Sequence, residues 1–253
     1  MKNKWLVYGI DPAPKKGLSV YDGCGFDHIP IEDASSYLEE IGKKGKNVLV
    51  CWDSPLTAPS FSSTAKIEGS VFTQRKIESF FSRKNWKPPK GISVRGYAGC
   101  PHWTISRFLL GLPQIGKFDS THLPFNLQTS DIEKPKSGIN VVEVHPALAV
   151  WLALRDNRKI KPDGWAYKDK KEKSSFEKIL TELKKTELFS DALEGFAPKT
   201  VDDDGLDARV AYALGTAWLN NAHNVKILGD RDSGGFLLPM IDKIEDEWAK
   251  FQI

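Results

Sequence analysis

The chain has 253 residues, of which 40% are hydrophobic and 11% aromatic, and its net charge is +3. This apolar content suffices for a hydrophobic core and excludes intrinsic disorder as the main state, whereas so mild a charge does not by itself indicate a nucleic-acid binder. No run approaches the roughly 18 apolar residues that span a bilayer, and three widely spaced cysteines indicate neither a disulfide framework nor a zinc site. We therefore expect a cytoplasmic protein with reduced thiols.

The chain opens with strand patterns. Residues 4–10 (KWLVYGI) form a short apolar run, typical of a strand buried on both faces, and the run ends at Asp11. Residues 17–22 and 26–31 flank a Gly-Cys-Gly turn and predict a hairpin, so that the first three strands form an antiparallel meander. The apolar spacing over residues 31–45 predicts a helix after them.

A second apolar run, residues 47–52 (NVLVCW), predicts a parallel strand and also ends in an aspartate, Asp53. Residues 57–138 then hold much of the Pro, Gly and Ser of the chain, with helical periodicity only over residues 72–81 and 104–110. We interpret this stretch as an insertion after the fourth strand, packed on the core. The core domain is expected to comprise residues 1–56 and 139–253.

A third apolar run, residues 139–144 (INVVEV), predicts another strand, which contains Glu143. His145 and a proline end this strand before a helix expected over residues 147–154. Because side chains alternate along a strand, Glu143 and His145 are expected on the same face.

The last third of the chain predicts two helices. A basic cluster at residues 168–173 is interpreted as the charged entrance of a helix or, as the second alternative, as a phosphate contact. It precedes apolar residues at i, i+3, i+4 and i+7 over residues 176–183. A helix rich in small residues is expected over residues 208–222, and Asp204 and Asp207 lie at its start. Asp202, just before them, is expected to cap this helix.

Four aspartates are therefore predicted to converge. The carboxyl ends of parallel strands meet at one edge of an α/β sheet, which brings Asp11 and Asp53 together. The i, i+3 spacing of Asp204 and Asp207 puts both on one helical face, near the positive end of the helix dipole. Carboxylates this close repel one another unless a divalent cation neutralises them, and ligation by oxygen alone suits Mg²⁺ or Mn²⁺. The sequence therefore predicts a metal site.

The order of these segments resembles the RNase H-like fold, a mixed sheet with an antiparallel meander, then parallel strands, and helices on its faces. More closely, the chain resembles domain of unknown function 429, a predicted family of RNase H-like nucleases, and RuvC-type junction resolvases share this layout. The segments that carry the resemblance are GIDP (9–12), DSPL (53–56), EVHPA (143–147), DGLDARVAYAL (204–214) and GGFLLP (234–239).

The resemblance implies a nuclease that hydrolyses the phosphodiester bonds of DNA or RNA with two bound metal ions, Mg²⁺ or Mn²⁺, and water as the nucleophile. Carried over to this sequence, Asp11 would bridge both ions and Asp53 would hold one. Either Asp204 or Asp207 would complete the site of the other ion.

The roles of Glu143 and His145 stay open. Glu143 is either a fourth catalytic carboxylate or a buried group that needs an arginine partner, because an unpaired charge inside an apolar strand is costly. His145 either positions water or the leaving group, since an ordinary histidine pKa of about 6.5 allows proton transfer near neutrality, or hydrogen-bonds a backbone carbonyl.

The predicted insertion has a basic segment, residues 66–95, with eight basic and two acidic residues among several aromatic ones. This mixture is typical of surfaces that follow phosphates and stack bases, although the aromatic residues could equally form a small core. The predicted nucleic-acid contacts are Arg75, Lys76, Arg83, Lys84 and Trp86.

The sequence is also compatible with two functions other than that of a nuclease. Phosphotransferases of the actin and sugar-kinase type share the strand order and an aspartate after the first strand, but they need glycine-rich phosphate loops, and the predicted hairpin offers only Gly23-Cys24-Gly25. The other alternative is a catalytically inactive module that binds nucleic acid or protein.

Overall fold

A computed structural model describes residues 5–13, 15–57, 75–94, 101–112, 125–131, 135–160, 164–222, 224–230 and 233–252. Its main sheet has six strands in the order β3-β2-β1-β4-β6-β5, in which β3, β2 and β1 are antiparallel neighbours and the remaining neighbours are parallel. The predicted mixed α/β class is therefore confirmed. The strands are β1 (Leu6–Ala13), β2 (Gly17–Tyr21), β3 (Phe26–Ile29), β4 (Asn47–Trp52), β5 (Asn126–Gln128) and β6 (Gly138–Glu143).

Strand β1 extends further than the apolar run that predicts it. Its parallel pairing with β4 ends at Ile10 opposite Trp52, but its antiparallel pairing with β2 continues through Asp11, which lies opposite Ser19. Asp11 is thus part of the strand, one residue beyond the point where β4 stops. Strand β5 comes from within residues 57–138 and pairs with β6, so the main sheet includes a strand from the predicted insertion.

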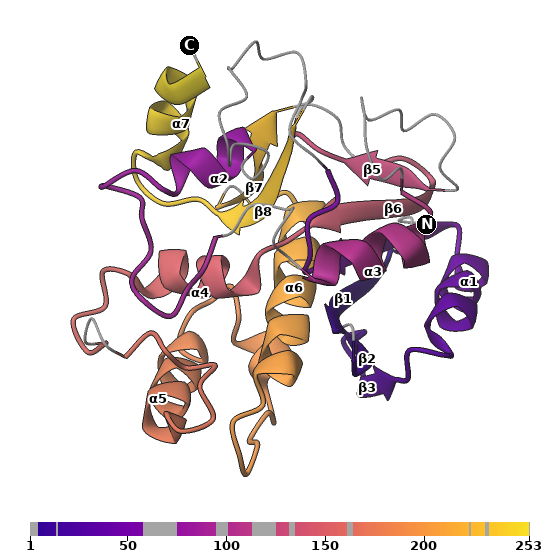
Figure 1. Ribbon diagram of the computed structural model, residues 1–253, viewed down its shortest axis with the longest axis horizontal. Helices are drawn as coiled ribbons and strands as arrows, with labels where there is room; N and C mark the ends of the chain where they lie inside the picture. Colours follow the sequence, from indigo (N-terminus) through magenta and orange to yellow (C-terminus); the bar gives the residue numbers. More distant parts are fainter. Residues whose placement is uncertain are drawn as a thin grey trace.

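Helices cover both faces of the sheet because the strand residues alternate between two cores. In β4, Leu49 and Cys51 belong to a core shared with α4 (Pro146–Leu154), α5 (Lys173–Leu183) and α6 (Asp203–Leu219). Val48, Val50 and Trp52 belong to the opposite core, which contains residues of α1 (Ala34–Lys44) and α3 (Pro101–Leu110). Figure 1 shows α6 between the strands β1 and β2 and the pair of helices α4 and α5.

The contact between α6 and β1 depends on a glycine. A Cβ atom built on Gly9 would lie 1.9 Å from the backbone oxygen of Ala208, so any side chain at this position would force the helix away from the strand. This close approach places the first turns of α6 beside the end of β1, where Asp11 lies.

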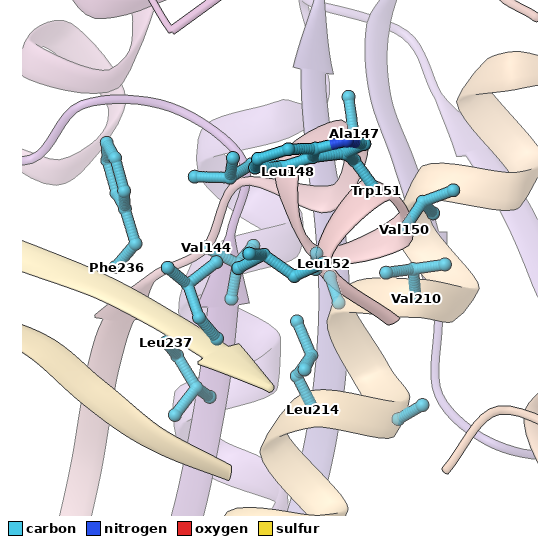
Figure 2. Packing of buried hydrophobic residues seen from close by; sticks show 14 of the residues in the cluster. Val144, Ala147, Leu148, Val150, Trp151, Leu152, Val210, Leu214, Phe236 and Leu237 are labelled. Atoms are coloured by element: carbon cyan, nitrogen blue, oxygen red, sulfur yellow. The ribbon is translucent and has the colours of Figure 1, made fainter. Parts of the chain in front are cut away.

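A second, two-stranded sheet packs against β6, α4 and α6. The hairpin of β7 (Val225–Asp230) and β8 (Gly234–Pro239) joins the main sheet through a parallel bridge between Val144 and Leu237. Figure 2 shows α4 side chains packed between α6 and β8. Among the described residues, the remaining helices are α2 (Lys76–Phe80) and α7 (Ile244–Gln252), which contact each other, and the short 3₁₀ helix Asp191–Leu193. None of the described helices is long and apolar enough to cross a membrane.

Candidate metal centre

Three of the four predicted metal ligands meet in the structure. Oxygen atoms of Asp11, Asp53 and Asp207 all lie within 4.8 Å of one another. The side chains come from β1, from the residue after β4 and from the second turn of α6. Asp207 is only 1% exposed, whereas Asp53 is partly accessible. Among the described residues, no other group of three histidine, cysteine or acidic side chains comes as close together.

Local backbone contacts hold these carboxylates in place. The backbone N–H of Asp53 donates to the carbonyl of Ile10 at 2.9 Å, which fixes the end of β4 against β1. At the start of α6, the side chain of Asp202 accepts a hydrogen bond from the backbone N–H of Gly205 at 2.9 Å, which confirms its predicted capping role. Asp207 follows within the helix and faces the strand ends.

The three carboxylates make one another harder to ionise. Burial, followed by the charges of Asp53 and Asp207, raises the pKa of Asp11 well above its ordinary value. Burial also raises the pKa of Asp53 to about 8 and that of Asp207 to about 6, although the ammonium of Lys168 opposes both shifts. Without a cation these carboxyls therefore retain protons more strongly than usual, and a bound cation would favour their ionised form.

Lys168 and Tyr167 also belong to the site, and the sequence does not predict them. The Lys168 ammonium donates a hydrogen bond to Oδ2 of Asp207, and the buried Tyr167 hydroxyl donates to Oδ1 at 3.4 Å. Burial alone would lower the pKa of Lys168, but the charge of Asp207 raises it well above its ordinary value. In the sequence, only the basic cluster at residues 168–173 hints at a functional role for Lys168. Its distance along the chain from Asp207 does not indicate that the two residues meet.

Asp204, the fourth predicted ligand, lies outside the group of three. Its Oδ2 accepts a hydrogen bond from the Lys16 ammonium at 2.6 Å, and the side chain is 26% exposed. Lys16 comes from the turn between β1 and β2, so this ion pair links that turn to the start of α6.

Glu143, the predicted fourth catalytic carboxylate, lies outside the group of three and has an arginine partner. Both of its oxygens accept hydrogen bonds from the Arg75 guanidinium, at 2.6 and 2.7 Å, and one also accepts from the backbone N–H of Leu56 at 2.9 Å. Glu143 therefore fits the second of the two roles that the sequence left open, that of a buried carboxylate with an arginine partner. It fixes the segment that follows Asp53.

His145 likewise takes the structural role. Its Nδ1 accepts from the backbone N–H of Leu148 and so caps α4, while Nε2 lies 3.3 Å from the carbonyl oxygen of Ser93. Burial, followed by the charge of Lys168, lowers the pKa of His145 to about 4. The ring is thus neutral near pH 7 and both nitrogens have backbone partners, as in the structural alternative, while the predicted role in proton transfer stays a prediction.

Two of the predicted nucleic-acid contacts are also wrong. Arg75 is 1% exposed, because its guanidinium lies between Glu143 and Glu78. Trp86 is 4% exposed, since it stacks on Phe80 and its indole N–H donates to Glu247. The other three, Lys76, Arg83 and Lys84, are exposed, and their contact with nucleic acid stays a prediction.

The donor set of the site fits a hard divalent cation. All three groups offer carboxylate oxygens, the ligands that Mg²⁺ and Mn²⁺ prefer. Two oxygens on opposite sides of such an ion lie about 4–5 Å apart, and the separations in this group stay within 4.8 Å. One ion could therefore reach Asp11, Asp53 and Asp207 together.

The raised pKa of Asp53 predicts how stability changes with pH in metal-free protein. The pKa of Asp53 is about 8 in the folded chain against an ordinary 3.8, so between these values the folded state binds a proton that the unfolded state has lost. Its contribution to the free energy of unfolding then falls as pH rises, by up to about 1.4 kcal/mol per pH unit. Asp53→Asn lacks this titration and should lose less stability between pH 5 and pH 8.

Urea unfolding of both proteins at several pH values, in the presence of EDTA, measures the difference. The wild-type protein should lose stability relative to Asp53→Asn as pH rises. Parallel pH profiles for the two proteins would show that Asp53 is ionised throughout and that the carboxylates do not interact as described.

Comparison of the chain with protein-family models, with curated proteins and with solved structures gives no match.

Proposed function

We propose that this protein hydrolyses phosphodiester bonds in nucleic acid at a Mg²⁺ or Mn²⁺ centre held by Asp11, Asp53 and Asp207. The observation that carries the proposal is the meeting of these three carboxylates, from two strand ends and a helix, within 4.8 Å. Charged side chains rarely share a partly buried site unless they are paired or bind a metal. Here Lys168 contacts Asp207, so a single lysine charge faces a group of three carboxylates.

The sheet order supports the further proposal of an RNase H-like fold. An antiparallel β3-β2-β1 meander is followed by the parallel strands β4 and β6, in the order that the resemblance implies. Acidic residues on β1, after β4 and on the helix packed against β1 also match that layout. The predicted second Mg²⁺ or Mn²⁺ ion remains part of the proposal, and Asp204 would serve it only after leaving Lys16.

In this mechanism the residues of the chain bind and orient the reactants. Bound divalent ions supply water activation and stabilisation of the leaving oxygen. Asp11, Asp53 and Asp207 provide the ligands, while the Glu143–Arg75 pair holds the segment after Asp53 in position. Lys16 and Lys168 place positive charge beside the carboxylates, where a phosphodiester would approach.

The test is incubation of the purified protein with single-stranded, double-stranded and branched DNA and RNA. We expect cleavage with Mg²⁺ or Mn²⁺ and none with EDTA. ATP turnover without cleavage would overturn the proposal in favour of a phosphotransferase. Binding without cleavage across all metals and substrates would favour the inactive module.

A further inference from the structure

Lys168 occupies a position that conflicts with a metal ion. Its ammonium contacts Oδ2 of Asp207, and Tyr167 lies beside Oδ1 of the same carboxylate. A divalent ion bound by Asp207 would lie within a few ångströms of the ammonium, and two cations so close repel each other strongly. The ammonium therefore competes with a metal ion for Oδ2 of Asp207.

The surroundings of Lys168 allow its side chain to move away. Asp207 is 1% exposed, but the Lys168 side chain is 36% exposed, so the lysine that contacts this buried carboxylate already borders water along part of its length. Lys168 lies in a turn held by a hydrogen bond from the backbone N–H of Asp169 to the carbonyl of Ala166. This turn can stay in place while the long side chain changes conformation.

We propose that Lys168 is a resident counter-cation, which neutralises Asp207 in the metal-free protein and releases it when Mg²⁺ or Mn²⁺ binds. The inference rests on the proposed function, and it adds that metal binding is an exchange of one cation for another. The released ammonium remains beside the carboxylates, where it suits an oxygen of the substrate phosphate as a point charge.

The exchange predicts that Lys168 weakens metal binding. Calorimetric titration of Mn²⁺ into Lys168→Met should show affinity about tenfold tighter than wild type, because no charged hydrogen bond has to be broken. Lys170→Met is the matched control. It removes the same charge from an exposed side chain two residues away, and its affinity should stay within about twofold of wild type.

Lys168→Met should also lose stability in EDTA and regain it with Mn²⁺, because the ion replaces the missing ammonium. If this variant does not fold without metal, Lys168→Gln offers the same comparison, since its amide donates to Asp207 without a charge. Lys168→Arg, which keeps the charge, should bind Mn²⁺ about as tightly as wild type.

The outcomes separate this inference from the proposed function. Equal Mn²⁺ affinity in wild type, Lys168→Met and Lys170→Met would overturn the exchange and leave the metal centre standing. Absence of Mn²⁺ binding in all of these proteins would overturn the metal centre, and the exchange with it. Tight binding confined to the Lys168 variants without a charge would support the exchange.

Discussion

Replacing Asp11 by Asn is expected to abolish metal-dependent cleavage of nucleic acid while leaving the fold intact. Asp11 has Asp53 and Asp207 as its neighbours, and an amide oxygen in its place carries no charge to hold a divalent ion. Loss of the ion removes several kcal/mol of transition-state stabilisation, which corresponds to a fall in rate of about 10³-fold or more. Because the substitution relieves repulsion among buried carboxylates, stability without metal should not fall.

The matched control is Asp203→Asn. It removes the same charge from the same helix as Asp207, but the Asp203 carboxylate does not belong to the group of three. Initial rates of cleavage with Mn²⁺, together with circular dichroism of each variant, separate the two. Undiminished cleavage by Asp11→Asn would exclude this group of carboxylates as the active site.

Replacing Arg75 by Met should cost about 3–5 kcal/mol of folding free energy, the usual cost of removing one partner from a buried ion pair. The Arg75 guanidinium donates two hydrogen bonds to Glu143 and two more to Glu78. Its central carbon lies 5.2 Å from the centre of the Phe236 ring. Without the guanidinium, two buried carboxylates would lose their cation. Chemical denaturation at pH 7 measures the loss.

Lys76→Met is the control for this prediction, because it removes a neighbouring positive charge from an exposed position. It should change the free energy of unfolding by less than about 0.5 kcal/mol. If Arg75→Met does not fold, Arg75→Lys keeps the charge but loses the planar fork, and a loss of about 1–3 kcal/mol is expected. Equal stability of the Arg75 and Lys76 variants would contradict the burial of Arg75.

The parts of the fold that the sequence predicts are those with a strong local signal. The buried strands β1, β4 and β6 each contain a mainly apolar run, and α5 shows a clear helical period. Strand β5 has only three residues, too few to show any period, and its existence depends on pairing with β6. The convergence of Asp11, Asp53 and Asp207 could be predicted because sites in α/β sheets lie at the carboxyl ends of the strands, where the start of a helix can join them. The separation of these residues along the chain carries no such information.

The errors concern partners that lie far away in the sequence. The basic segment around Arg75 suggests a charged surface, but Glu143, 68 residues further on, draws that guanidinium into the core. Trp86 similarly finds its hydrogen-bond partner 161 residues away in α7. Nothing local distinguishes a buried arginine with two acidic partners from an exposed one, and the same limitation hides Lys168 near Asp207.

The metal centre is tested most directly by locating Mn²⁺ through its anomalous scattering in crystals of the wild-type protein. We expect a peak about 2.2 Å from oxygens of Asp11, Asp53 and Asp207, with the Lys168 ammonium displaced from Asp207. A map at saturating Mn²⁺ with no peak among these carboxylates, and with Lys168 still bound to Asp207, would contradict this expectation.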